Sequence, residues 1–255
     1  MQNVDPLFIL QPIIVIAFSL AIVLYWHRKH PITPAVLGFS LLAYGGAITV
    51  KAIFQYATIP LLLTRSDWVL GLYLGLQTVV FEVGGAFLVA RYAISKRRMR
   101  GEDAEGYGLT LALWENAGLL GILALVNILY YAAVISTGGP LAENLYILLS
   151  KNQPQLFSTP LEAIPIIAWG TLERVSSLLV HFSWGYLCVK AAYLHKKKYL
   201  ALALPMGMVD FLVPFVLVLS IPIFECVVFA LSVICLIASL EATRPSRRSQ
   251  KRRKD

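Results

Sequence analysis

The chain has few charged residues for its length. Only 14% of its 255 residues are Asp, Glu, Lys or Arg, whereas 58% are hydrophobic and the mean hydropathy is +0.71. A water-soluble domain carries about 25% charged residues, so this composition excludes an ordinary soluble protein. It predicts an integral membrane protein whose first partner is the lipid bilayer.

Several chemical signatures are also missing. The three cysteines, Cys188, Cys226 and Cys235, lie inside apolar runs and lack the spacing of a metal site or a disulfide framework. The sequence contains no phosphate-binding glycine loop, no haem-attachment motif and no recognisable nucleophile motif. The N-terminal segment lacks the basic residues of a secretory signal, so we expect the first apolar run to remain as a helix.

Seven apolar stretches are long enough to cross a bilayer, which takes about 20 residues per helix. They are Leu7–Trp26, Pro34–Leu63, Trp68–Ile94, Tyr107–Ser136, Pro165–Leu194, Leu200–Ser220 and Pro222–Leu240. The sequence therefore predicts an all-α, polytopic transmembrane helix bundle of seven spans, with residues 1–240 as a single domain. The junction at Ser220–Pro222 has almost no loop, so a six-span fold is the main alternative.

Basic residues set the expected orientation. Most of the 22 Lys and Arg residues follow spans one, three, five and seven, in clusters at 28–29, 96–100, 196–198 and 244–254. An odd span count puts all four clusters on one side, and the positive-inside rule makes that side cytoplasmic. We therefore predict an outside N-terminus, a disordered cytoplasmic tail over residues 241–255 and a location in the plasma membrane. Since the positive charge flanks membrane spans, no nucleic-acid partner is expected.

Four ionisable residues lie deep inside predicted spans. A charge at a helix centre costs about 2.5–3.5 kcal/mol, so one that persists needs a partner, a metal ion or a wet cavity. At 1.5 Å per residue, Glu82, Glu115, His181 and Asp210 lie about 12–20 Å from the basic ends of four different spans. They therefore form one layer near the midplane and are the best candidate for a functional site. A polar network that only fixes helix packing is the structural alternative.

Two further charged residues lie at another depth. Glu173 and Arg174 are about 30 Å from the basic end of span five, near the opposite surface. We expect Glu173 to have a structural role there, as a hydrogen-bonding or ion-pair partner of Arg174 or Lys51. Glu225, close to the start of span seven, is expected at the membrane interface.

The order of these polar residues resembles a known family. The segments Phe81–Phe87, Tyr107–Glu115, Glu173–His181 and Met206–Phe211 are similar, in order and spacing, to motifs of the YhfC-type intramembrane metalloproteases. These proteins are related to the CAAX prenyl proteases and to the seven-span Aph subunit of γ-secretase. The resemblance covers about residues 75–215 and agrees with a seven-span layout.

The resemblance implies a zinc site at which a membrane-embedded peptide or protein is hydrolysed. Glu82 and Glu115 match positions of catalytic carboxylates, and His181, Glu82 and Asp210 match positions of metal ligands. In that scheme Glu115 is a general base or a further ligand, and Asp210 binds the metal or orients a ligand.

The sequence also departs from the family pattern. Val83 stands where the family has a second glutamate, Ala86 where it has an arginine, and Leu111 and Met206 where it has histidines. The remaining oxygen-rich set favours a harder ion or a weak zinc site. Three functions therefore stay open: an intramembrane metallopeptidase, a catalytically inactive member that serves as a membrane scaffold or binding protein, and a small transporter or proton relay. Only the first is an enzyme.

Overall fold

The computed structural model describes residues 2–62 and 64–244. Within these residues the chain is helical throughout its regular elements and has no strand. A bilayer core holds no water that can bond to exposed backbone groups, so a spanning segment must satisfy its N–H and C=O groups internally. The helical fold class predicted from composition is thereby confirmed.

Seven helical runs in the described residues are long and apolar enough to cross a membrane. They are Pro6–Lys29, Pro34–Leu62, Asp67–Ser95, Gly101–Thr137, Pro160–Leu194, Lys197–Phe215 and Ile221–Thr243. The seven predicted spans are all present, with ends that differ by a few residues. Spans six and seven remain separate because the chain turns at Ser220, which has a positive φ of 60°.

Several spans consist of more than one kind of helix. The first half contains η1 (Pro6–Ile9), α1 (Leu10–Lys29), α2 (Pro34–Leu62), α3 (Asp67–Gln77), η2 (Thr78–Val83), α4 (Gly84–Ser95), η3 (Gly101–Asp103), α5 (Ala104–Leu113), η4 (Trp114–Gly121) and α6 (Ile122–Thr137). The second half contains α7 (Gly139–Asn152), η5 (Pro154–Phe157), α8 (Pro160–Leu194), α9 (Lys197–Ala203), η6 (Leu204–Phe215), α10 (Val216–Leu219) and α11 (Ile221–Thr243). Segments η2 and η4 are π-helical, and η6 is a 3-10 helix.

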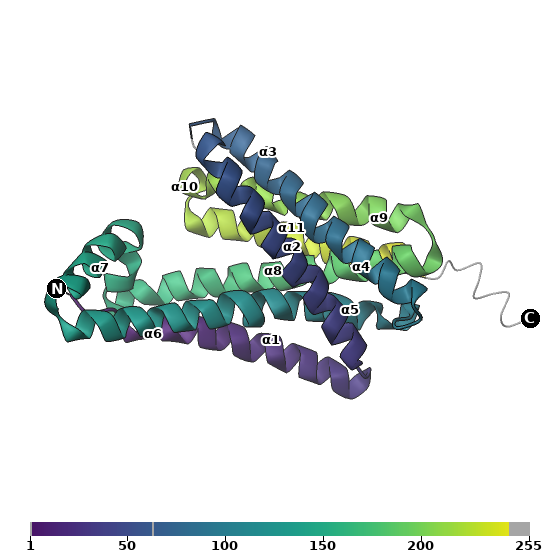
Figure 1. Ribbon diagram of the computed structural model, residues 1–255, viewed down its shortest axis with the longest axis horizontal. Helices are drawn as coiled ribbons and strands as arrows, with labels where there is room; N and C mark the ends of the chain where they lie inside the picture. Colours follow the sequence, from purple (N-terminus) through teal and green to yellow (C-terminus); the bar gives the residue numbers. More distant parts are fainter. Residues whose placement is uncertain (1, 63, 245–255) are drawn as a thin grey trace, which may run out of the picture.

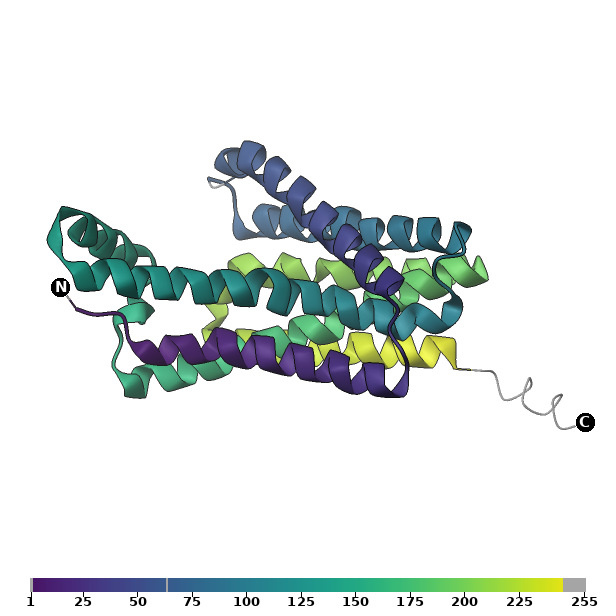
Figure 2. The ribbon, with the colours of Figure 1, turned by 60° about the horizontal axis from the view of Figure 1, so that its bottom comes forward.

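Helix α8 is the centre of the bundle. It packs against α5, α11, α4 and α1, and Figures 1 and 2 show it running along the long axis of the molecule. Its closest neighbour is α5, where Gly108 and Gly185 face each other so closely that a methyl group on Gly185 would lie 2.8 Å from the Gly108 Cα. Small residues at a crossing let two membrane helices approach and gain van der Waals contact.

The outer faces of the bundle are apolar. Leu24, Ile53, Val80 and Leu161 are among the many large hydrophobic side chains that remain exposed. In water such a surface promotes association, whereas lipid tails solvate it. The buried face is apolar as well, and Trp184 and Tyr107 are the largest of the fully buried side chains.

Helix α7 is an element that the sequence does not predict. It follows α6 through Gly138 and Gly139, whose φ angles of 71° and 84° suit residues without a Cβ. Figure 1 shows α7 at the end of the molecule marked N, far from α4 and α9. The assignment of the basic end to the cytoplasm stays a prediction, and most of the predicted basic tail lies outside the described residues.

Candidate functional site

The carboxylates predicted to form the site lie in irregular helical segments. Glu82 belongs to η2, Glu115 to η4 and Asp210 to η6, whereas His181 lies in the regular helix α8. π-Helical turns interrupt the regular pattern of hydrogen bonds and are frequent at functional sites. The three carboxylates therefore come from the parts of the bundle with the least regular backbone.

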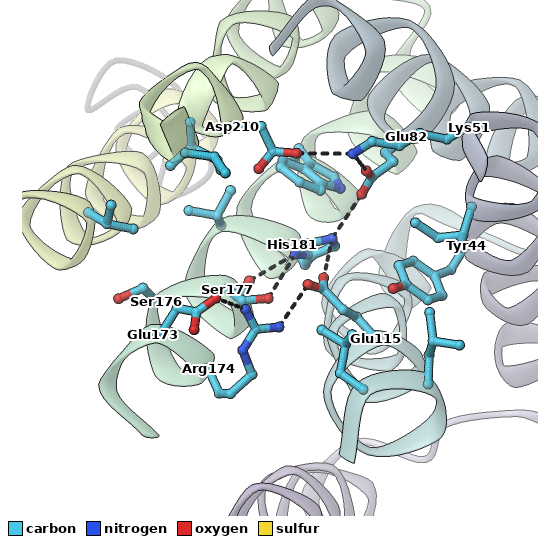
Figure 3. Close-up of a pocket in the computed structure, with 18 of the residues that line it drawn as sticks. Tyr44, Lys51, Glu82, Glu115, Glu173, Arg174, Ser176, Ser177, His181 and Asp210 are labelled. Carbon is cyan, nitrogen blue, oxygen red and sulfur yellow. Dashed lines mark hydrogen bonds and ion pairs between the residues drawn. The ribbon is translucent and has the colours of Figure 1, made fainter. Parts of the chain in front are cut away.

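All four predicted residues line one cavity, which we call the central cavity. Its volume is about 250 Å³, and it lies among α2, η2, η4, α8, η6 and α11. Figure 3 shows the polar side chains pointing toward one another inside it. The residues of its wall with polar side chains include Tyr44, Lys51, Glu82, Glu115, Glu173, Arg174, Ser177, His181 and Asp210. The predicted convergence of four side chains from four spans is confirmed.

His181 is held in a fixed orientation. Its Nδ1 lies 3.0 Å from the Ser177 backbone oxygen, which can only accept a hydrogen bond, so Nδ1 carries the hydrogen. Its Nε2 lies 3.3 Å from Glu82 Oε2 and 2.6 Å from Glu115 Oε2. An imidazole that donates one N–H to a backbone carbonyl and turns the other nitrogen toward carboxylates has the arrangement of a metal-binding histidine.

One carboxylate oxygen of this group is left over. Glu115 Oε2 is buried and, within the described part of the chain, has no hydrogen-bond partner of suitable geometry, although His181 Nε2 is close to it. His181 Nε2 is hydrogen-bonded to Glu82 Oε2 instead. One N–H cannot point at both carboxylates, whereas one cation can contact both.

Lys51 forms the other half of the site. Its Nζ donates hydrogen bonds to Glu82 Oε1 at 2.6 Å, to Thr78 Oγ1 at 2.7 Å and to Asp210 Oδ2 at 3.0 Å. These three bonds use all three hydrogens of the ammonium group. Asp210 is thereby held on the Lys51 side of the cavity, and its assignment as a metal ligand stays a prediction.

Arg174 closes the network at its other end. Its guanidinium lies 3.2 Å from Glu115 Oε1 and also pairs with Glu173. The predicted partnership of Glu173 with Arg174 is thus confirmed, whereas the alternative partnership of Glu173 with Lys51 is wrong. The prediction that Arg174 lies near the opposite surface is also wrong, because α8 continues outward to Pro160 and the Arg174 side chain, 15% exposed, lines the central cavity. Asn116 fixes this part of α8 because its Nδ2 donates to the Arg174 backbone oxygen at 2.9 Å.

Acidic and basic groups alternate along the network. The order is Asp210, Lys51, Glu82, His181, Glu115, Arg174 and Glu173 (Figure 3). Glu82, Glu115 and Asp210 outnumber Lys51 and Arg174 by one, and the partly exposed Glu173 adds a fourth carboxylate at the end of the network. In a low-dielectric interior an uncompensated charge is costly. A positive charge at His181 Nε2, as an imidazolium proton or a bound cation, would offset the charge of the two carboxylates beside it.

The donor set fits one metal ion at His181 Nε2. Within residues 2–62 and 64–244, no three His, Cys, Asp or Glu side chains are already spaced as a closed metal site. Two donors of a tetrahedral zinc ion lie about 3.3–3.6 Å apart, and the 3.3 Å between His181 Nε2 and Glu82 Oε2 matches this spacing. Glu115 Oε2 would have to move back by about 1 Å. A second ion beside Asp210 does not fit, because the Lys51 ammonium fills that position.

The family's missing histidines are not replaced at their own positions. Leu111 and Met206 are buried in the main apolar core and do not line the central cavity. Lys51, from α2, and Arg174, from α8, are the residues whose places in the network the sequence did not reveal. Glu225 is buried among the helices, with 5% of its surface exposed, and its position at the membrane interface stays a prediction.

A comparison with protein families bears on this site directly. The family described as YhfC intramembrane metalloprotease matches residues 13–230, which is most of the chain. No curated protein and no solved structure matches the chain. The match includes every residue of the alternating network, and the chain therefore belongs to the YhfC intramembrane metalloprotease family.

Proposed function

We propose that the chain is an intramembrane metallopeptidase whose metal ion is held by His181, Glu82 and Glu115. The observation that carries this proposal is the position of His181, whose Nε2 faces two carboxylate oxygens while Nδ1 is held by the Ser177 carbonyl. One nitrogen and two oxygens make three protein donors, which is the number typical of catalytic zinc sites. Membership of the family supports the same chemistry.

The bound ion would supply Lewis acidity and an activated water molecule for attack on a peptide carbonyl. Lys51 and Arg174 hold the outer oxygens of Glu82 and Glu115, so that the inner oxygens stay turned toward the ring. Their positive charges also offset the charges of the two carboxylates. Asp210 acts through Lys51, because it fixes the ammonium group without reaching the ring.

The substrate in this proposal is a peptide or protein segment inside the membrane. The central cavity lies in the middle of the spans, and its wall also contains the apolar residues Val209, Val213, Phe224 and Val228. An apolar wall beside a charged centre suits a hydrophobic chain that presents one peptide bond. Following the positive-inside rule, we place the basic end in the cytoplasm and the protein in the plasma membrane.

A second candidate function is a catalytically inactive family member that serves as a membrane scaffold or binding protein. The observation that favours it is Lys51, which bonds to Glu82 and Asp210 and so fills part of the site with a tethered cation. With His181 as an imidazolium, three cations face the carboxylates of Glu82, Glu115 and Asp210, and the partly exposed Glu173 is the one carboxylate in excess. The same network would then fix the packing of α2, η2, η4, α8 and η6.

Hydrolysis in liposomes separates the two candidates. The probe is a quenched-fluorescent peptide of about 20 apolar residues, long enough to span the bilayer. The purified chain is expected to cleave it, to lose activity with a chelator and to regain it with zinc. Glu82→Gln and Glu115→Gln should each lower the rate by at least about a hundredfold, since even the loss of an outer partner of a metal ligand costs 10–100-fold.

The control variant is Glu143→Gln, which changes an exposed glutamate of α7 that lies outside the central cavity. It should keep the wild-type rate. If the wild-type chain binds no ion and cleaves no probe, the second candidate is supported. If protons or ions flow through the liposomes without cleavage, the transporter alternative is supported instead.

A further inference from the structure

A second cavity, which we call the vestibule, shares Glu173 with the central cavity. It has a volume of about 430 Å³ and is lined by residues of η1, α1, α6, η5, α8 and the region where α10 meets α11. Glu173 lines both cavities, and its partner Arg174 pairs with Glu115 of the candidate metal site (Figure 3). The vestibule is therefore separated from that site by one ion pair.

The wall of the vestibule is rich in side-chain amides. Gln11, Asn127, Gln153 and Gln155 come from three different parts of the chain and all line it. Each amide offers two N–H donors and a carbonyl acceptor, which match the hydrogen-bonding groups of a peptide backbone. Gln153 and Gln155 are exposed, and Gln11 and Asn127 are half-buried, so these amides are accessible to a ligand.

The sequence of α8 makes room for one of these amides. A methyl group at Gly170 would lie 2.1 Å from Gln11 Nε2, so the Gln11 side chain passes over α8 at a position that has no Cβ. The aromatic rings of Trp169 and Tyr131 line the same cavity. Their faces attract cations as well as apolar groups.

Glu225 gives the vestibule its charge preference. Only 5% of its surface is exposed, and its Oε2 has no hydrogen-bond partner among the described residues. Together with Glu173, it places two carboxylates in the wall. Of the described residues that line the vestibule, none is Lys, Arg or His. A buried carboxylate without a partner, in a cavity that has no basic residue of its own, is complementary to a positively charged ligand.

We propose that the vestibule binds a positively charged group of a peptide, with Glu225 as its ionic partner and the amides as partners of the peptide backbone. The charged group is a primary ammonium, from either a lysine side chain or a free N-terminus. This inference rests on the proposed peptidase function only in one respect, namely that the bound peptide is also the peptide that is cleaved. Binding itself requires neither a metal ion nor hydrolysis.

The test is a binding measurement with the full-length chain in lipid nanodiscs, in the presence of a chelator. Three fluorescent alanine–leucine peptides of equal length serve as probes: one acetylated with a single lysine, one acetylated with norleucine in its place, and one with norleucine and a free N-terminus. Fluorescence anisotropy should show that the wild-type chain binds at least one ammonium peptide about tenfold more tightly than the neutral peptide. The ammonium peptide that binds more tightly shows whether the ammonium group comes from a lysine side chain or from a free N-terminus.

Three variants locate the preference. Glu225→Gln should remove most of it while leaving the binding of the neutral peptide unchanged. Asn127→Asp adds a carboxylate to the same wall and should raise the preference about threefold. Glu143→Gln, on α7 outside the vestibule, is the matched control and should bind like the wild type.

Equal binding of the three peptides by the wild-type chain overturns the proposal. So does a preference that survives Glu225→Gln. If Glu225→Gln does not fold, an unchanged preference in Asn127→Asp overturns the proposal and a raised one supports it. If the chain prefers the ammonium peptide but cleaves no peptide, the vestibule proposal is supported and the peptidase proposal is contradicted. If it cleaves peptides but shows no preference, the peptidase proposal is supported and the vestibule proposal is contradicted.

Discussion

Two contact regions of this bundle differ in how their helices meet. Where α5 crosses α8, the helices are regular, the contact is formed by Gly108 and Gly185, and the surrounding side chains are apolar and fully packed. In the layer of Glu82, Glu115 and Asp210, the helices change to π or 3-10 form, and charged groups meet around a cavity. The first region gains stability from close approach, whereas the second depends on charge balance.

This difference separates close packing from charge balance within one fold. A packed crossing of small residues tolerates almost no change of volume, but it contributes no reactive group. The irregular layer leaves space of about 250 Å³ and keeps seven ionisable groups in an alternating order. Substitutions in the two regions should therefore lower the stability of the fold for different physical reasons.

The largest expected effect is that of Lys51→Met, which removes a cation from the charged layer. Glu82 and Asp210 then face each other without their shared partner, and breaking a buried ion pair costs about 3–5 kcal/mol. Thermal unfolding in detergent should show a strongly lowered midpoint. Added zinc should recover part of the loss, because the vacated position lies between two carboxylates.

Lys151→Met is the matched control, since Lys151 is exposed at the end of α7. It should unfold like the wild type. A Lys51→Met chain that is as stable as the wild type without zinc would show that charge balance does not hold the layer together.

A smaller effect is expected at the packed crossing. In Gly185→Ala the new methyl group would lie 2.6 Å from Leu111 Cδ1 and 2.8 Å from Gly108 Cα, so the two helices must separate. Overpacking of this kind costs about 1–3 kcal/mol, and zinc should not recover it. Gly38→Ala, at a glycine with nothing within 4 Å of the added methyl group, should be neutral or slightly stabilising. Equal unfolding midpoints for the two alanine variants would contradict the tight crossing.

The smallest effect concerns a single buried hydrogen bond between α5 and α4. Tyr107 on α5 is fully buried, and its hydroxyl donates to the Ala86 backbone oxygen of α4 at 2.9 Å. Tyr107→Phe should cost about 0.5–1.5 kcal/mol, measured as a small drop in the unfolding midpoint. Tyr130→Phe, whose parent side chain is 53% exposed, should show no change. A larger loss at Tyr130 than at Tyr107 would contradict this assignment.

The sequence predicts the spans because hydrophobic length is a direct consequence of bilayer thickness. The prediction Leu7–Trp26 and the observed Pro6–Lys29 differ only at ends where polar flanks continue the helix. Helix α7 could not be predicted in the same way, because its 14 residues include Glu143 and Lys151 and are too few for a span. Its place beside α6 follows from a glycine turn and tertiary packing.

The sequence also predicts part of the site, because the depth of a residue can be counted along a straight span. Counting along straight helices puts Glu82, Glu115 and His181 at similar depth, and the structure brings them together. The same count puts Lys51 about 26 Å from Pro34, too far toward the other end. Figure 1 shows why this count is wrong for Lys51: α2 crosses the bundle obliquely, so each residue of α2 adds less than 1.5 Å of depth. Neither tilt nor the π-helical turns has a signal in single-sequence hydropathy.

The most direct test of the central claim is the zinc content of the purified chain after equilibration with zinc and removal of the excess. We expect close to one ion per wild-type chain and almost none in His181→Ala, with the helical circular dichroism signal retained in both. Equal zinc content in the two proteins, or none in the wild type, would contradict a metal ion held at His181 between Glu82 and Glu115.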